Sequence, residues 1–219
     1  MKKCVCIIVG FGPGMGLALA KAFGREGCAL ALLSRDPGRH ASLLAPLDQE
    51  SFTVRTWAAD AGDEAALTAA LAAAERELGP AEVLIYNALA PTFLPPTALK
   101  ADQLVADFRV NVAGALVATQ RVLPGMRVRG RGTVLFTGGG WAFQPWSGAA
   151  SPGIGKAGLR NLAQSLAQEL AGTDVHIGTV TIAGQVQAGT HFDPDKIAQA
   201  YVTLYRQAPA EFETEFIYD

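Results

Sequence analysis

Glycine residues crowd one short segment near the start of the chain. Four of them alternate over residues 10–16, between an apolar run at residues 4–9 and a helical pattern at residues 17–23. Backbone N–H groups in such a loop, together with the positive end of the following helix, bind a pyrophosphate, and a Cβ would block its close approach. The strand before the loop and the helix after it favour a phosphate site over a plain turn.

The elements that must hold this loop alternate along the sequence. Short β-branched or aliphatic runs alternate with longer segments of helical period, which predicts βαβ units and a parallel sheet. The helical segments include residues 64–78 and the segment after Lys156, where leucines repeat on one face. The expected strands cover residues 4–9, 28–33, 52–57, 83–86, 133–137, 175–182 and 212–218. Because these strands fit one sheet, we expect a single domain over residues 1–219.

The composition predicts a folded protein that binds neither nucleic acid nor a membrane. Of 219 residues, 24 are glycine, 50% are hydrophobic and 17% are charged, which excludes a disordered chain, and the glycines lack a collagen period. A formal net charge of -2 and the lack of a basic stripe argue against a nucleic-acid partner. No stretch approaches the roughly 20 apolar residues of a membrane span, and the first apolar run is too short for a signal peptide. We therefore expect a cytoplasmic protein.

The cysteines and histidines predict neither a disulfide framework nor a metal site. Cys4, Cys6 and Cys28 are too few for a framework, so we expect them to be reduced, small apolar residues on buried strands. The three histidines are scattered, with no carboxylate or cysteine at metal-ligand spacing.

Polar landmarks follow the expected strands in a recognisable order. Asp60 follows the third strand, Asn87 follows the fourth, and Asn111 and Lys156 lie in later helical segments. Together with the spacing Gly10-x-x-x-Gly14-x-Gly16, this order resembles the short-chain dehydrogenase/reductase family over essentially the whole chain. The resemblance implies an α/β fold, a doubly wound Rossmann-type parallel sheet of about seven strands with helices on both faces. It also implies that NAD or NADP binds at the carboxyl ends of the strands.

The resemblance further implies which residues contact the cofactor. The glycine loop would hold the pyrophosphate, residues 60–61 would contact the adenine, residues 87–88 would line the middle of the cofactor, and the backbone at Val186 would hold the carboxamide. The cofactor-binding candidates are Gly10, Gly14, Met15, Gly16, Ser34, Arg35, Asp60, Ala61, Asn87, Ala88, Lys156, Gly184 and Val186.

Charge at the end of the second strand distinguishes the two dinucleotides. An acidic residue there binds the ribose 2′-OH of NAD, whereas an arginine accommodates the 2′-phosphate of NADP. Here the strand ends in Ser34 and Arg35, with Asp36 next and Arg39 close by, which favours NADP(H). A register shift of one residue would bring Asp36 into that position, and Arg35 as a solvated loop residue is the other alternative.

The catalytic residues that the resemblance implies are only partly present. The family reduces a carbonyl by hydride transfer and uses a tyrosine as the acid, with a lysine four residues later, a serine and an asparagine. Asn111 and Lys156 are retained as catalytic candidates, but the tyrosine position is Pro152 and the serine position is Gly139. Ser151 followed by proline is typical of a helix N-cap and first turn, and no register shift restores a tyrosine.

Three interpretations follow from the absence of the family's serine and tyrosine. The first is an NADPH-dependent oxidoreductase acting on a small carbonyl or alcohol, slowed by about 10²–10⁴, whose proton comes from water held by Lys156 or from Ser151, Ser147 or Tyr86. For two of these residues a structural role is the simpler alternative to proton donation: Ser151 as a helix N-cap and Tyr86 as a core aromatic. The second is an NADP(H) binder without turnover, as a sensor or one subunit of a hetero-oligomer. The third is non-redox chemistry in the same crevice, such as dehydration or cyclisation.

Apolar residues outside the loop point to a substrate class and to an oligomer. Trp141, Phe143 and Trp146 precede Lys156 and form either a wall for an apolar or aromatic small-molecule substrate or ordinary packing under a loop. The segment 184–196, where the family places a substrate lid, is brief and predicts an open site. The resemblance places a dimer face on the helices of Asn111 and Lys156. An apolar row there predicts a homodimer or homotetramer: Leu104, Phe108, Val112 and Leu116.

Overall fold

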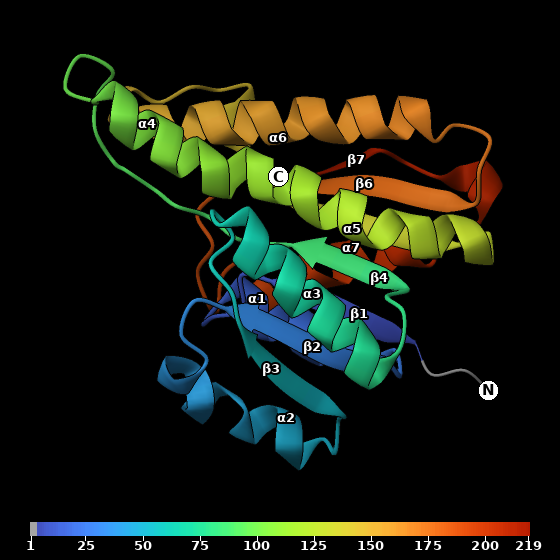
Figure 1. Cartoon of the computed structure of the whole chain (residues 1–219). Helices are drawn as coiled ribbons and strands as arrows, with labels where there is room; N and C mark the ends of the chain where they lie inside the picture. Colours follow the sequence, from blue (N-terminus) through green and yellow to red (C-terminus); the bar gives the residue numbers. More distant parts are fainter. Residues whose placement is uncertain (1–3) are drawn as a thin grey trace.

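Seven parallel strands form one sheet at the centre of the fold (Figure 1). The computed structural model describes residues 4–219. The strand order is β3-β2-β1-β4-β5-β6-β7, and every neighbouring pair is parallel. The strands are β1 (Val5–Val9), β2 (Ala29–Ser34), β3 (Val54–Ala58), β4 (Val83–Tyr86), β5 (Gly132–Gly139), β6 (Val175–Ile182) and β7 (Glu215–Tyr218). The predicted doubly wound, Rossmann-type sheet is confirmed, with its switch point between β1 and β4.

Helices cover both faces of this sheet because its central strands are apolar on both sides. One core lies between the sheet and α3, α5 and α6, and the other lies between the sheet and α1, α2 and α7. The helices are α1 (Met15–Arg25), α2 (Ala45–Gln49), α3 (Glu64–Leu78), α4 (Ala101–Phe108), α5 (Gly114–Arg129), α6 (Ala150–Glu169) and α7 (Pro194–Tyr205). Figure 1 shows α3, α5 and α6 on the near face of the sheet.

Most of the predicted elements are found within one or two residues of their expected limits. β4 and β6 and the helix α3 match their predicted ranges, and Asp63 caps α3 by accepting a hydrogen bond from the N–H of Ala66. β7 begins at Glu215 rather than at residue 212, because Phe212 leaves the sheet to stack on His176. A π-helical turn, Arg109–Ala113, joins α4 to α5 and carries Asn111.

The predicted N-cap of α6 is wrong. The helix begins at Ala150, before Ser151, and no side chain caps it. The hydroxyl of Ser151 instead donates a hydrogen bond to the buried carboxylate of Asp107 on α4, 2.5 Å away. This contact with a residue 44 positions away satisfies the hydroxyl, which would otherwise be buried without a partner.

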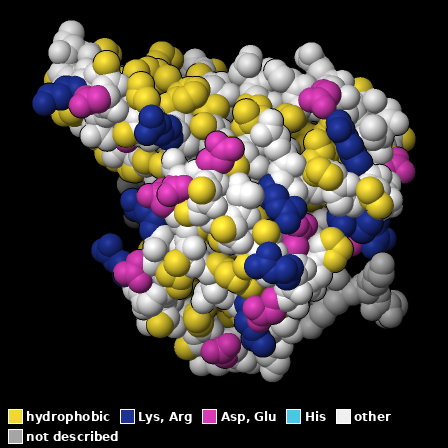
Figure 2. Space-filling view, viewed as in Figure 1, with side chains coloured by type: hydrophobic (Ala, Val, Ile, Leu, Met, Phe, Trp, Pro, Cys, Tyr) yellow, Lys and Arg dark blue, Asp and Glu magenta, His cyan; other side chains and the backbone are white. Residues whose placement is uncertain are grey.

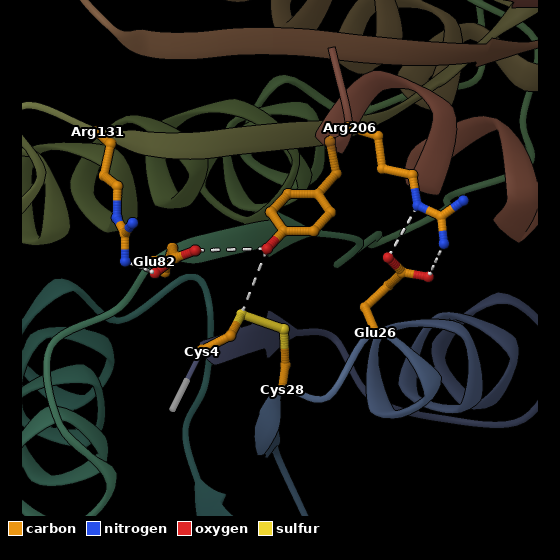
Figure 3. Close-up of a disulfide and its surroundings, with 7 residues drawn as sticks. Cys4, Glu26, Cys28, Glu82, Arg131 and Arg206 are labelled. Carbon is orange, nitrogen blue, oxygen red and sulfur yellow. Dashed lines mark hydrogen bonds and ion pairs between the residues drawn. A yellow bond between two sulfur atoms is a disulfide. The ribbon is translucent and has the colours of Figure 1, made fainter. Parts of the chain in front are cut away.

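The prediction that all three cysteines are reduced is wrong for Cys4 and Cys28. The parallel register pairs Val5 with Ala29, so the residues just before them lie side by side at the amino ends of β1 and β2. Their Cα atoms are 4.4 Å apart and their sulfur atoms form a disulfide (Figure 3). The disulfide closes a covalent loop around β1, the glycine segment and α1, and Cys6 is the free, buried cysteine of the described chain.

Candidate functional site

Two adjoining cavities open at the carboxyl ends of the strands, beside the glycine loop. The larger has a volume of about 760 Å³ and the smaller about 450 Å³, and Asn87 and Leu89 line both. The larger cavity is reached from the ends of β5 and β6, whereas the smaller lies between the ends of β1, β2 and β3. Because they share Asn87 and Leu89, the cavities adjoin just beyond the end of β4.

The glycine loop is shaped by close backbone packing. Gly10 has a φ of +89°, and a Cβ there would lie 2.5 Å from the backbone nitrogen of Ala88. No side chain fits in that position, so the ends of β1 and β4 come together only with glycine. Gly16 is equally confined, because its Cβ would meet the Cα of Phe11 at 3.1 Å. Gly14 has a φ of +78° and open space around it, and Met15 faces the larger cavity.

Basic residues border the smaller cavity at the end of β2. Arg35 and Arg39 are exposed and form no ion pair within the described residues, and His40 lines the same cavity. The Asp36 carboxylate accepts a hydrogen bond from the backbone N–H of Arg39 at 3.2 Å. Ser34 is buried and lines the cavity together with Arg35. Two arginines and two aspartates thus line this cavity, and neither arginine is ion-paired with a carboxylate of the described residues.

The remaining predicted contacts of the adenosine end also reach this cavity. Asp60 and Ala61 line it, and the Asp60 carboxylate accepts a hydrogen bond from the N–H of Gly62 at 2.8 Å. Ala88 lines it as well, next to Gly10. The structure thus brings together all the residues that the sequence assigns to this end of a dinucleotide.

Lys156 is the one titratable side chain among the described residues that line the larger cavity. It projects from α6 and is 8% exposed. Its ammonium donates a hydrogen bond to the main-chain carbonyl oxygen of Thr137 at 2.6 Å. Burial lowers the pKa of Lys156 from 10.5 to about 8, because the site offers no carboxylate to stabilise the charge. Gly184 and Val186 line the same cavity on the far side.

Glycine at position 139 leaves room for this lysine. A Cβ on Gly139 would lie 3.3 Å from Lys156 Cγ, so the aliphatic part of the lysine fills the space where a side chain would begin. Pro152, one turn before Lys156, is buried in α6. Neither position supplies a hydroxyl group.

The three hydroxyl groups that the sequence offers as substitutes all lie outside the larger cavity as the structure describes it. Ser151 is bound to Asp107, and Ser147 is exposed. Tyr86 is fully buried, and its hydroxyl donates to the carbonyl oxygen of Val110 at 2.5 Å, in space that Gly114 leaves free. Burial raises the pKa of Tyr86, so this phenol is a core group, which is the plainer of the two roles that the sequence left open.

Asn111 binds the backbone behind the site. Its amide accepts a hydrogen bond from the N–H of Ala90 at 2.7 Å and donates one to the carbonyl oxygen of the same residue at 3.0 Å. Its side chain is 2% exposed and lines neither cavity. Asn111 therefore positions the segment that follows β4. Asp107 assists by accepting a hydrogen bond from the N–H of Thr92 at 3.1 Å.

Aromatic side chains form one wall of the larger cavity. Phe93 packs edge to face on Trp141, and Trp141 packs on Trp146, each pair with ring centroids 6.1 Å apart. Trp146 is 56% exposed and stands at the mouth. The predicted wall is correct for both tryptophans but not for Phe143, which instead packs on the guanidinium of Arg160.

Sequence reasoning missed three polar residues that line the larger cavity and a tyrosine behind them. Thr137 lines the larger cavity, and its hydroxyl donates to the amide oxygen of Asn87 at 3.0 Å. Tyr201 on α7 donates in turn to the Thr137 hydroxyl at 2.8 Å. A threonine in an apolar strand gives no signal of such a role. Gln144 and Gln185 also line the larger cavity, in segments without a periodic pattern.

The described part of the chain contains no group of three or more metal-binding side chains. Within residues 4–219, no helix is both long and apolar enough to cross a membrane.

Comparison with known proteins gives the family. The short chain dehydrogenase family model matches residues 4–191. The chain is 31% identical over 194 residues to 2-(S)-hydroxypropyl-CoM dehydrogenase 3 of Xanthobacter autotrophicus, covering 85% of this chain and 75% of that one. It is 29% identical to the inactive 2-(S)-hydroxypropyl-CoM dehydrogenase 2 of the same organism, over 81% of this chain and 79% of that one.

A solved structure shares the whole fold. A metagenomic short-chain oxidoreductase, crystallised in complex with NADP, superposes with a TM-score of 0.89 at 24% identity, covering 98% of this chain and 96% of that one. The matched region includes the glycine loop, both cavities and α6. This chain belongs to the short chain dehydrogenase family.

Proposed function

We propose that this protein is an NADP(H)-dependent oxidoreductase that acts on a small apolar or aromatic carbonyl compound or alcohol. The observation that carries the proposal is the pairing of two joined cavities, one bordered by Arg35 and Arg39 and the other containing Lys156. The cofactor-binding candidates named from the sequence support it, because all of them except Gly14 and Gly16 line one or both of the two cavities.

The site fits a dinucleotide. Gly14 has open space where a Cβ would stand and is the N-cap of α1, so the N-terminus of that helix suits a pyrophosphate. Unpaired Arg35 and Arg39 suit a 2′-phosphate, since guanidinium groups bind phosphate by charge-assisted hydrogen bonds. Asp36, the residue that would favour NAD, also lines this cavity, and one of its oxygens accepts the N–H of Arg39. The metagenomic relative of the same fold binds NADP, in agreement with this assignment.

The chain's own residues provide the rest of the chemistry. The bound dinucleotide would supply a hydride to the carbonyl carbon of the substrate. With glycine at 139 and proline at 152, we propose that the protein lacks the serine and tyrosine that the family uses. Lys156 then donates the proton that the substrate oxygen requires, directly or through one water, and regains it from solvent. One N–H of its ammonium is held by Thr137, which leaves two for the substrate.

The walls of the larger cavity support the substrate class. Phe93, Trp141 and Trp146 provide flat apolar surface, and no carboxylate from the described residues lines the cavity. An uncharged substrate with an aromatic or aliphatic body would gain from this burial, whereas a cationic one would find no partner.

A second candidate is an NADP(H)-binding protein without turnover, such as a sensor or an oligomer subunit. It is favoured by the hydroxyl groups near the larger cavity, because Ser151, Tyr86 and Thr137 are all engaged with other protein groups. Xanthobacter autotrophicus has a relative of this chain that is described as inactive. Non-redox chemistry in the same crevice would require the same binding but no consumption of NADPH.

We also propose a homodimer or homotetramer. Figure 2 shows hydrophobic side chains gathered over α4 and the adjoining start of α6. Of the predicted row, Phe108 and Leu116 are exposed, and Leu104 and Val112 are half-buried. Val105 and Ile154 add exposed apolar surface to it. Sedimentation of the purified protein tests this, and a monomer at micromolar concentration would contradict it.

Two measurements test the proposed function. Fluorescence titration compares the binding of NADPH and NADH, and NADPH consumption is then followed across a panel of aldehydes and ketones. Turnover, strongest for aromatic carbonyls, supports the oxidoreductase. Tight NADPH binding without turnover on any carbonyl supports the second candidate, and no binding of either dinucleotide overturns both.

The substrate wall has a test of its own. Replacing Trp146 with alanine should raise the KM for an aromatic substrate, because the indole ring would no longer contact the ligand. Val128→Ala is the matched control, since Val128 is 89% exposed on α5 and lines neither cavity. An unchanged KM in Trp146→Ala would contradict the assignment.

A further inference from the structure

A chain of hydrogen bonds crosses the sheet from helix α7 to the glycine loop. The phenol of Tyr201 donates to Thr137 Oγ1 at 2.8 Å, and that hydroxyl donates to Asn87 Oδ1 at 3.0 Å. The Asn87 amide nitrogen then donates to the carbonyl oxygen of Gly10 at 2.9 Å. The direction is fixed, because an amide nitrogen that donates to Gly10 leaves only the amide oxygen of Asn87 to accept.

The first member of this chain is outside both cavities. Tyr201 is 0% exposed in the core under α1 and α7, on the other side of the sheet from Lys156. Thr137 and Asn87, in contrast, line the larger cavity. Burial raises the pKa of Tyr201, so its phenol remains a hydrogen-bond donor throughout the physiological range. A buried hydroxyl of this kind needs a partner, and Thr137 is the one it has.

Thr137 connects this chain to the lysine. Its hydroxyl accepts a hydrogen bond from Tyr201 and donates one to Asn87. Its main-chain carbonyl oxygen accepts a hydrogen bond from the ammonium of Lys156 at 2.6 Å. Displacing this one residue would therefore disturb Asn87, Gly10 and Lys156 together.

We propose that Tyr201 is a positioning residue for the dinucleotide site, acting through Thr137 on Asn87 and the Gly10 loop. The inference rests on the proposed function, because it takes these cavities to bind NADP(H). The competing explanation is that Tyr201 only fills the core with its ring. The two explanations differ in what the hydroxyl does, so the test removes the hydroxyl and keeps the ring.

Tyr201→Phe is the test variant and Tyr205→Phe is its matched control. Both tyrosines lie on α7, but the phenol of Tyr205 points to Glu82 and Cys4 at the amino ends of the strands, away from both cavities. We expect Tyr201→Phe to weaken NADPH binding about fivefold, the effect of one hydrogen bond between neutral groups, and Tyr205→Phe to leave it within about twofold. Melting temperatures of both variants report the structural cost of losing a buried hydroxyl.

A double-mutant cycle connects Tyr201 to its partner. Thr137→Val should weaken NADPH binding about as much as Tyr201→Phe, and the double variant should show less than the product of the two effects. Thr137→Ser keeps the hydroxyl and should therefore bind NADPH as tightly as the wild-type protein. Wild-type affinity in Tyr201→Phe, equal weakening in Tyr205→Phe, or independent effects in the cycle would each overturn the proposal.

A second readout does not need the ligand. Amide hydrogen exchange of the peptide spanning residues 10–16 should be faster in ligand-free Tyr201→Phe than in wild type or Tyr205→Phe, because the Gly10 carbonyl loses a fixed partner. Unchanged exchange would overturn the positioning role. If the wild-type protein binds no dinucleotide, the proposed function fails. Hydrogen exchange then still tests whether Tyr201 positions the Gly10 loop.

Discussion

The ammonium nitrogen of Lys156 and the main-chain carbonyl oxygen of Thr137 lie 2.6 Å apart in a hydrogen bond. This bond ties the one titratable group found on the walls of the larger cavity, in the chain as described, to the end of strand β5. A lysine held in this way has a defined position, and burial keeps its pKa near neutrality, at about 8. Both properties suit an acid that must protonate a substrate oxygen.

The pH dependence of reduction should follow the ionisation of Lys156. The ammonium is the donor, so kcat/KM should be level below about pH 8 and fall as the pH rises above it, by about tenfold per pH unit. Lys156→Gln should lose about 10²–10⁴ of the rate and with it the fall at alkaline pH. Initial rates of NADPH consumption from pH 6 to about 10 measure both. A rate that stays level through pH 9, or a fully active Lys156→Gln, would show that another group is the donor.

Removing the same lysine should stabilise the ligand-free protein. At pH 7 the ammonium is charged in both the folded and the unfolded chain, and lowering its pKa from 10.5 to about 8 corresponds to a cost of about 3 kcal/mol. Lys156→Met removes that cost but also the charge-assisted bond to Thr137, worth about 2 kcal/mol, so the melting temperature should rise by about 2 to 4 °C.

The size of this stabilisation changes with pH in a defined way. Between the folded pKa of about 8 and the unfolded pKa of 10.5, the unfolded chain binds more protons, so wild-type stability rises with pH. The advantage of Lys156→Met should therefore shrink from pH 8 toward pH 10. Calorimetric scans at pH 7 and 9.5 test this, and a variant that is less stable than wild type at pH 7 would contradict it.

The proposed preference for NADPH should depend on Arg35. Arg35→Asp removes a charge-assisted hydrogen bond to the 2′-phosphate and adds a like charge, so NADPH binding should weaken by about 10- to 100-fold while NADH binding changes little. Titration with both dinucleotides measures the ratio. Arg76→Asp on α3 is the control, because Arg76 is also exposed and free of ion pairs in the described chain but lines neither cavity. Equal losses for NADPH and NADH in Arg35→Asp would refute the assignment.

Reduction of the Cys4–Cys28 disulfide should destabilise the fold without direct damage to either cavity. The two cysteines are 24 residues apart, and opening a loop of that size costs about 3 kcal/mol, or about 6 to 12 °C in melting temperature. Scans with and without dithiothreitol measure the loss, and the double variant Cys4→Ala/Cys28→Ala should not respond to the reductant. Cys6 is buried with its thiol pKa raised, so it should not exchange with the pair. Mass spectrometry that finds both cysteines free in the oxidised protein would contradict the disulfide.

Local patterns in the sequence were enough to predict the sheet and the glycine loop. β4, β6 and α3 are continuous apolar or periodic segments, and their limits depend on their own residues. The loop is equally local, because Gly10 and Gly16 are required by backbone atoms that any Rossmann-type turn brings close.

The features that sequence reasoning missed all depend on contacts between distant residues. The hydroxyl of Ser151 binds Asp107 on another helix, so a local capping pattern was misleading. The disulfide exists because the register of two strands aligns Cys4 with Cys28, which composition does not reveal. Tyr201 reaches Thr137 across 64 positions of sequence, and neither residue type marks the pair in advance.

The two cavities share Asn87 and Leu89 in their walls, and this has a consequence for ligand selection. A dinucleotide that engages one cavity places its other end at a millimolar or higher effective concentration in the second, which raises its affinity by about 10²–10⁴ over either half alone. Mononucleotides carry the same adenine and phosphate groups but fill only one cavity. Because only a ligand long enough to reach both cavities gains this affinity, we expect selection by ligand length in addition to contacts with a particular base or ring.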